Sequence, residues 1–416
     1  MLSALERGTL VRAMALVSSG LAVATACGAR SGLDLPARDL GGASLGSLGL
    51  TDGGRTGTGT GSAPGGDGGG DPADGSGSGS SGTSATSGST ASVHSIGSSC
   101  VGGGVMPPSC AGASPGLTGC GACDESCCAT FEVTGVTYYR TYMNDGSGPT
   151  GETDLATVSS FVLDRYLVTV GRFRQFVSAW NGGAGYMPAV GSGLHTHLNG
   201  GQGLAAVGQP GTYETGWQES DNSWVGPTDS MLDMCAPAST WTPSPDSNES
   251  LPINCINWWE AYAFCIWDGG FLPSEAEWEL AAAGGTEQRE YPWGTASPGT
   301  NNEYAIYGYG LTGCYFPTAE TCDGAMNIAP VGTATRGAGL YGQLDMAGNV
   351  AQWTLDWFAP YVDPSVDAAQ LEPQQVRSIR GGAYHALPVD LVPWYRAGRY
   401  APGRTADVGF RCARVP

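Results

Sequence analysis

The sequence contains no lysine. All 18 basic residues are arginine, and with 38 acidic residues and 4 histidines the formal net charge is −20. This charge argues against a nucleic-acid partner and against electrostatic docking on anionic lipid, since both attract clustered positive charge. After residue 27 no window holds 18 consecutive apolar residues, so no later segment is expected to span a bilayer.

The first 27 residues have the pattern of an export signal. Arg7 and Arg12 precede an apolar run that starts at Ala13, and small residues end it immediately before Cys27. This end is similar to a bacterial lipoprotein cleavage site, although small residues at these positions also suit ordinary secretory cleavage. We therefore expect a lipoprotein signal peptide over 1–27 and lipidation of Cys27. The mature protein should be anchored in the bacterial cell envelope, on the periplasmic face or at the cell surface.

Residues 28–99 consist almost entirely of Gly, Ser, Thr, Asp and Ala. Such a segment has too few apolar side chains to offset the chain entropy that folding removes, so we expect a flexible tether. A glycine-rich coil of this length has a root-mean-square span on the order of 45–50 Å. The tether would hold the folded part clear of the membrane.

Cysteine is concentrated in one short segment. Setting Cys27 aside leaves 12 of the 13 cysteines, an even number in an exported chain, and six of these lie between Cys100 and Cys128. The density predicts a disulfide-stapled neck over 100–130, and six cysteines allow fifteen pairings between which the sequence does not choose. Zinc binding by Cys120 and Cys123 is the less favoured alternative, because oxidation competes with metal ligation.

Hydrophobic patterning resumes at Phe131. Residues 161–170 are rich in β-branched and aromatic side chains and predict a strand, whereas 171–180 have the apolar spacing of a helix. A second helix is expected over 257–267, ended by two glycines. Ser274 and Glu277 form a capping box for a third helix that reaches Gly284. The acidic cluster Glu275–Glu279 is interpreted as this helix start rather than as an acid–base pair.

Three segments together carry a family resemblance: LPINCINWWEAYAFCIWDGGFLPSEAEWELAAAGG (251–285), GLYGQLDMAGNVAQW (339–353), and RSIRGGAYH with ADVGFRCAR near the C-terminus. They resemble the formylglycine-generating enzyme family, the sulfatase-modifying factors. The resemblance covers about residues 155–416 and implies a domain over 131–416. It implies an α+β fold related to C-type lectins, with few regular elements and long loops.

Active members of that family hold copper with two cysteines and oxidise a sulfatase cysteine to formylglycine. Here Ala386 and Leu391 match the two cysteines, Ala383 matches a serine of the same motif, and Ala351 stands where those enzymes have a tryptophan. No cysteine occurs between Cys322 and Cys412. Because Cu(I) prefers sulfur ligands, the resemblance implies that copper and formylglycine-generating activity are absent. The former catalytic pocket would be formed by Tyr384, His385, Trp394 and Arg399.

The resemblance also implies structural bonds and calcium sites. By the resemblance, Cys265 would pair with Cys412. Apart from the resemblance, Cys314 and Cys322 lie only eight residues apart and are expected to close a loop, which leaves Cys235 and Cys255 as the remaining pair. One structural calcium site would use Asp345, Gly348, Val350 and Gln352, where a neutral glutamine replaces the family's glutamate. A second would use Asp323 with the carbonyl of Ala325, although the asparagine that completes it is replaced near Ile306.

Two functions remain open. The first is an exported lipoprotein whose domain serves as a binding or structural module for an unknown peptide or glycan, without nucleic acid. The alternative is a metal-dependent oxidoreductase, with non-haem iron or copper, of the same superfamily. His195 and His197 could contribute to an iron site, but their glycine-rich surroundings favour an irregular loop with ordinary hydrogen bonds.

Overall fold

The computed structural model describes residues 106–121, 125–308 and 327–416. The signal peptide, Cys27, the tether, Cys100 and Cys123 lie outside these residues, as do Cys314, Cys322 and Asp323. The elements form an α+β domain of four short helices, further single turns of 3-10 helix and four small sheets among the described residues. None of the helices in these residues is long and apolar enough to cross a membrane.

The largest sheet has the strand order β10-β9-β6-β11, from Arg396–Arg399, Arg377–Arg380, Ala351–Trp357 and Val408–Gly409. A second sheet joins β1 (Thr130–Val133), β4 (Phe161–Asp164) and β12 (Ala413–Arg414). The third contains the long hairpin β2 (Val136–Asn144) and β3 (Pro149–Val158) with β7 (Ser365–Val366), and the fourth pairs β5 (Ala205–Ala206) with β8 (Ala368–Ala369).

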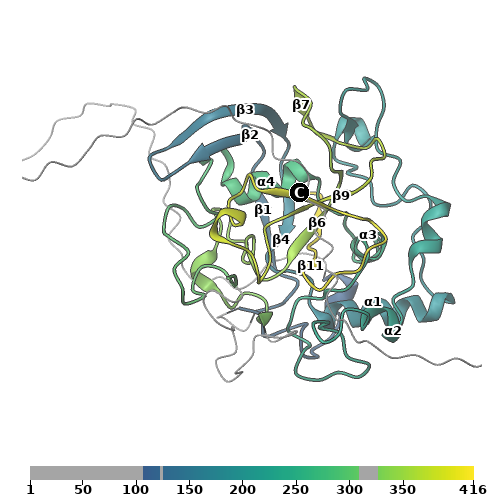
Figure 1. Cartoon of the computed structure of the whole chain (residues 1–416). Helices are drawn as coiled ribbons and strands as arrows, with labels where there is room; N and C mark the ends of the chain where they lie inside the picture. Colours follow the sequence, from purple (N-terminus) through teal and green to yellow (C-terminus); the bar gives the residue numbers. More distant parts are fainter. Residues whose placement is uncertain (1–105, 122–124, 309–326) are drawn as a thin grey trace, which may run out of the picture. The chain divides into compact units, whose positions relative to one another are not determined.

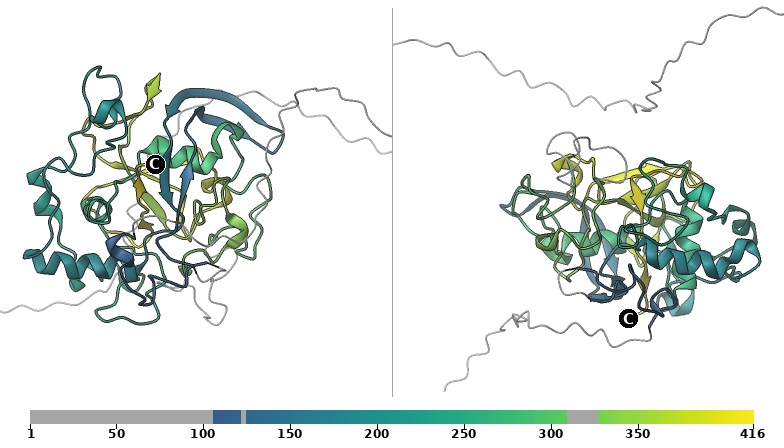
Figure 2. Two further views of the ribbon diagram at one scale, coloured as in Figure 1. Left: turned by 180° about the vertical axis from the view of Figure 1, so that it is seen from behind. Right: turned by 90° about the horizontal axis from the view of Figure 1, so that it is seen from below.

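The four helices are α1 (Val170–Trp180), α2 (Asp229–Leu232), α3 (Trp258–Trp267) and α4 (Glu275–Ala283). The β2–β3 hairpin and α2 lie on opposite sides of the ribbon in Figure 1, and the view from behind in Figure 2 agrees. The helices α1, α3 and α4 occur where the sequence predicts them. The strand predicted over 161–170 is shorter, since β4 ends at Asp164 and Val170 already belongs to α1.

Capping boxes set the starts of α3 and α4, and the one at α4 is the box that the sequence predicts. The Asn257 side chain accepts from the Glu260 amide at 2.9 Å at the start of α3. At α4 the Ser274 hydroxyl accepts from the Glu277 amide at 3.2 Å, and the Glu277 carboxylate accepts from the Ser274 amide at 2.7 Å. Gly284 then ends α4 in the left-handed conformation, which glycine adopts without steric penalty.

The helices α3 and α4 cover opposite faces of the largest sheet. Side chains alternate between faces along a strand, and Trp353 and Ile379 pack in the buried cluster that contains most of α3. Their neighbours Gln352 and Arg380 face α4 instead: Trp278 of α4 donates to the Gln352 side chain at 2.8 Å. Packing therefore fixes the sheet on both faces. The cavity described below opens at one end of this sheet.

Arginine and glutamate side chains join α4 to this sheet. Arg380 contacts Glu275 at 2.8 Å and Glu279 at 2.5 Å, and Arg396 contacts Glu275 at 2.5 Å. Burial raises the pKa of Glu279 to about 7, which the charge of Arg380 opposes. These carboxylates bind the strands that line the cavity, so the acidic cluster has the structural role that its position at a helix start indicates.

Disulfides fasten the loops to these elements. Cys265 of α3 is bonded to Cys412, the pairing that the resemblance implied, and Cys235 is bonded to Cys255. In the neck the sequence left the pairing open, and the structure joins Cys110 to Cys128 and Cys120 to Cys127.

The neck packs on the domain rather than standing apart from it. The buried Arg172 of α1 donates to the Ser109 hydroxyl at 2.9 Å and to the Cys127 carbonyl at 3.3 Å. The same guanidinium pairs with Asp164 at 2.9 Å and with Asp268 at 2.6 Å. A buried charge shared in this way makes the neck part of the folded unit.

Candidate functional site

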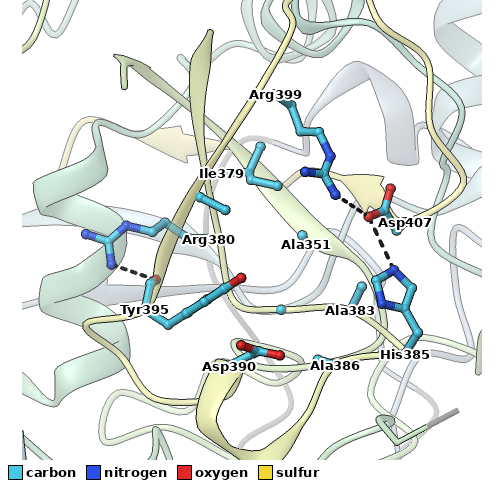
Figure 3. Close-up of a pocket in the computed structure, with 12 residues that line it drawn as sticks. Ala351, Ile379, Arg380, Ala383, His385, Ala386, Asp390, Tyr395, Arg399 and Asp407 are labelled. Carbon is cyan, nitrogen blue, oxygen red and sulfur yellow. Dashed lines mark hydrogen bonds and ion pairs between the residues drawn. The ribbon is translucent and has the colours of Figure 1, made fainter. Parts of the chain in front are cut away.

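A cavity of about 70 Å³ opens at the end of the largest sheet. Figure 3 shows that its wall combines small apolar side chains with charged ones. The residues that line it come from β6, β9, β10 and the loops beside them: Ala351, Ile379, Arg380, Gly382, Ala383, His385, Ala386, Asp390, Tyr395, Ala397, Arg399 and Asp407.

The strand register explains how these residues meet. Ile379 of β9 lies opposite Ala397 of β10, and Ala351 of β6 lies opposite Val408 of β11. The Ala351 amide donates to the carbonyl of Asp407 at 2.8 Å, which fixes Asp407 at the start of β11. Side chains from four strands or their ends therefore converge on one side of the sheet.

Asp407 links the charged groups of the cavity. Its Oδ2 lies 2.8 Å from Nη2 of Arg399 and 3.3 Å from Nε2 of His385, as the dashed lines in Figure 3 show. Burial by itself would raise the pKa of this carboxyl, but the hydrogen bond with His385 and the charge of Arg399 outweigh it and hold the pKa below its usual range. Asp407 is therefore an anion throughout the physiological pH range.

The positions that match the family's catalytic cysteines form an apolar wall. Ala386 and Leu391 are both buried and pack in one cluster with Ala305, Tyr307 and Ala347. The Ala386 amide donates to the Ala383 carbonyl at 2.8 Å, so the two alanines sit on one tight turn. No sulfur atom lines the cavity among the described residues.

Only two of the four predicted pocket residues line the cavity. His385 and Arg399 do, but Tyr384 packs against buried clusters, with its ring centroid 5.0 Å from that of His385. Trp394 packs against Tyr142 of β2, with ring centroids 4.5 Å apart. Tyr384 and Trp394 are therefore not among the residues that line this cavity, and Tyr395, which follows Trp394 just before β10 begins, lines it instead.

Sequence reasoning also missed Asp390 and Asp407. Asp390 ends a 3-10 turn over Pro388–Asp390, and its carboxylate accepts from the Leu387 amide at 2.9 Å. Asp407 had a usable signal, since it directly precedes the Val-Gly-Phe-Arg-Cys segment on which the resemblance rests. Because of this position, Asp407 could have been predicted as a pocket residue from the sequence.

The positions predicted for the first calcium site form an internal hydrogen-bond network. The Gln352 amide oxygen accepts from Arg411 at 2.6 Å and from Trp278 at 2.8 Å, and its amide nitrogen donates to the Asp345 carbonyl at 2.9 Å. The Asp345 carboxylate accepts from the Gly332 amide at 2.6 Å.

Arg411 makes this arrangement a poor fit for calcium. Its guanidinium also donates to the carbonyls of Leu344 at 2.7 Å and Asp345 at 2.9 Å. A divalent cation needs several free oxygen ligands, and both acceptor directions of Gln352 are already used beside a fixed positive charge. Gly348 and Val350 are buried in the same loop but supply carbonyl groups only. The second proposed site, at Asp323, lies outside the described residues.

His195 and His197 do not form a metal site. His195 is fully buried in an irregular loop, with Nδ1 3.0 Å from Glu214 and Nε2 3.1 Å from Glu277 of α4. Burial would lower the pKa of His195, but the two carboxylates outweigh it and raise the pKa to about 10. The imidazolium therefore joins this loop to α4. In the described part of the chain no group of three His, Cys, Asp or Glu side chains could hold a metal ion.

Comparison with known proteins agrees with this fold. Residues 130–416 match the family model described as the sulfatase-modifying factor enzyme 1-like domain. The chain is 30% identical over 301 residues to a formylglycine-generating enzyme of Thermomonospora curvata, a match that covers 66% of this chain and 88% of that one.

A mouse protein named inactive C-alpha-formylglycine-generating enzyme 2 is 27% identical over 291 residues, covering 65% of this chain and 79% of its own. Among solved structures, PvdO from Pseudomonas aeruginosa aligns with a TM-score of 0.42 and 19% identity over 73% of this chain and 100% of that one. The family match spans more than half of the sequence, and the chain therefore belongs to the sulfatase-modifying factor, or formylglycine-generating enzyme, family.

Proposed function

We propose that this protein is an exported lipoprotein whose sulfatase-modifying-factor domain binds a small polar group and does not generate formylglycine. The cavity wall carries the proposal. Ala386 and Leu391, which pack in one buried apolar cluster, occupy the positions that match the copper-binding cysteines. The polar side chains that line the cavity are Arg380, His385, Asp390, Tyr395, Arg399 and Asp407. Thiolate-held copper has no ligand there, because Cu(I) sites in proteins are built from sulfur.

The volume of the cavity limits the size of the group that it can bind. Sites for drug-sized ligands measure roughly 300–1,000 Å³ and one water fills about 30 Å³ of liquid, whereas this cavity measures about 70 Å³. It can admit a hydroxyl, carboxylate or amide at the end of a larger molecule. Arg399 can donate, and Asp390 and Asp407 can accept, so the tip of a peptide or of a glycan would be held by hydrogen bonds.

The direct test is oxidation of a peptide that contains Cys-x-Pro-x-Arg. The full chain, supplied with copper and oxygen, should leave the peptide mass unchanged, while a formylglycine-generating enzyme assayed in parallel converts it. Conversion above that of a heat-inactivated sample would refute the proposal.

Attachment to the membrane is tested separately. In a bacterial host the wild-type chain should be recovered with the membrane fraction and should incorporate labelled palmitate. The Cys27→Ser variant should lose the label and become soluble after signal cleavage. If this variant remains labelled, Cys27 is not the lipidated residue.

Metal content tests the alternative function, a metal-dependent oxidoreductase. No observation on the described residues favours an oxidoreductase, since none of their side-chain groupings offers three ligands to one ion. Elemental analysis of the purified full chain for iron and copper, with the binding of each metal titrated, tests this. A stoichiometric metal that survives chelation would favour the oxidoreductase.

A further inference from the structure

Two tryptophans stack on the surface near the start of α3, far in the sequence from the cavity residues. The rings of Trp224 and Trp259 are nearly parallel, at 12°, with centroids 4.7 Å apart. Trp224 is 44% exposed, which is high for so large an apolar side chain. Neither residue lines the cavity described above. We call this pair the Trp224 platform.

Hydrogen bonds hold the platform in place. The Trp259 indole donates to the Asp221 carboxylate at 3.0 Å, and the Asn257 side chain donates to the Trp224 carbonyl at 2.8 Å. The Gly226 amide next to the platform donates to Glu260 at 3.2 Å. A ring fixed in this way loses little conformational entropy when a ligand covers it, which favours binding.

The platform continues into further exposed apolar side chains. Met231, at the end of α2, is 38% exposed and Met234 is 63% exposed. The Cys235–Cys255 disulfide attaches this segment three residues before the start of α3. Methionine beside an exposed indole makes an adaptable contact surface.

The chain segment that contains Trp224 carries charge of one sign. Residues 211–240 contain no Arg, Lys or His, whereas Glu219, Asp221, Asp229 and Asp233 lie at or near the surface. None of these four carboxylates forms an ion pair among the described residues. Asp221 and Asp229 instead accept from the indoles of Trp259 and Trp241, at 3.0 and 2.9 Å.

The arginines that reach α3 are already engaged elsewhere. Arg404 pairs with Glu260, and Arg377 lies between the rings of Trp258 and Trp357, 3.6 and 3.8 Å from their centroids. The surface around Trp224 therefore combines an open aromatic ring with carboxylates that have no cationic partner within ion-pair distance.

We propose that the Trp224 platform binds a basic segment of another protein. An arginine side chain would stack on the exposed ring of Trp224, and neighbouring basic residues would meet Glu219 and Asp229. Cation–π stacking and charge complementarity act together in such a site. A sugar could stack on the same ring but would gain nothing from the carboxylates' charge, and this difference separates the two ligands. The site does not depend on the function proposed for the cavity.

The test uses the purified full chain and a fluorescein-labelled Gly-Arg-Arg-Gly-Arg-Arg peptide. Fluorescence anisotropy should show binding at 50 mM NaCl that is at least tenfold tighter than that of the matched glutamine peptide and that weakens at 300 mM. Trp224→Ala should weaken binding at least tenfold, and Trp224→Phe should retain most of it. Glu219→Gln with Asp229→Asn, which keeps the acceptor oxygen for Trp241, should weaken binding about threefold to tenfold and reduce the salt dependence.

Matched controls come from the opposite side of the domain. Trp293→Ala removes a partly exposed tryptophan that stacks on Tyr291, and Glu152→Gln removes an exposed acid of β3. Both should bind the arginine peptide as the wild type does. The proposal fails if Trp224→Ala binds like the wild type, if Trp293→Ala weakens binding equally, or if cellohexaose binds at this site while the arginine peptide does not.

Discussion

The two faces of the β10-β9-β6-β11 sheet hold their charges differently. On the α4 face, Arg380 has no exposed side-chain surface and shares Glu275 and Glu279, which are almost fully buried too. At the cavity, the Arg399 and His385 side chains that meet Asp407 are 39% and 46% exposed. Buried pairs cannot exchange partners without leaving a charge in the interior, whereas exposed ones can exchange a partner for a ligand. Charge therefore maintains the fold on one face and is available for recognition on the other.

The largest effect should come from the covalent bond between α3 and the C-terminal strand. Cys265 and Cys412 are 147 residues apart, so replacing both with serine frees a long loop and should lower the free energy of unfolding by about 4–5 kcal/mol. The Cys235–Cys255 bridge closes 20 residues, and its double serine variant should lose roughly 3 kcal/mol. Urea denaturation of both variants measures the difference, and equal losses would contradict the chain-entropy explanation.

Arg380 tests the buried face directly. Arg380→Met leaves Glu275 and Glu279 with fewer cationic partners in the interior and should cost roughly 3–5 kcal/mol, as the breaking of buried pairs does. Arg399→Met at the cavity should cost less, because the Arg399 side chain is 39% exposed and His385 stays within 3.3 Å of Asp407. Thermal unfolding of the two variants gives the ranking. If Arg399→Met is the more destabilising, the charges on the α4 face do not stabilise the fold more than those at the cavity.

A smaller, pH-dependent effect is expected at His195. Its pKa of about 10 in the folded protein lies above the pKa of 6.5 of the free side chain. Protonation of His195 therefore stabilises the folded state. The stabilisation is complete below pH 6.5 and is lost as the pH rises through 10. The wild type should therefore lose more stability than His195→Gln between pH 6 and pH 10.

His197 provides the matched control for that measurement. Neither of its ring nitrogens has a hydrogen-bond partner among the described residues, and burial lowers its pKa. His197→Gln should keep the pH dependence of the wild type above pH 7. If His197→Gln removes this pH dependence, the proton responsible is carried by His197 and not by His195.

The sequence predicted the scaffold better than the site, for physical reasons. The helix cap at Ser274 is a local signal, and the family motifs carry the Cys265–Cys412 pair with them. The cavity depends instead on how the chain turns before β10, where Tyr395 rather than the predicted Trp394 lines the cavity. Asp407 was missed because its role comes from partners in two other segments, Arg399 and His385, that no local pattern connects to it.

The smallest effect is expected from calcium at the Asp345 loop. An ion bound at a concentration a thousandfold above its Kd would add about 4 kcal/mol of stability, or roughly 8–16 °C in the melting temperature of a domain of this size. Because Arg411 and Trp278 use the Gln352 amide oxygen, at 2.6 and 2.8 Å, we expect a shift of less than about 1 °C. The melting temperature in 5 mM calcium chloride is compared with that in EDTA, for the wild type and for Asp345→Asn. A large rise in the wild type that Asp345→Asn abolishes would place calcium in this loop, and a rise that persists in the variant would place it elsewhere.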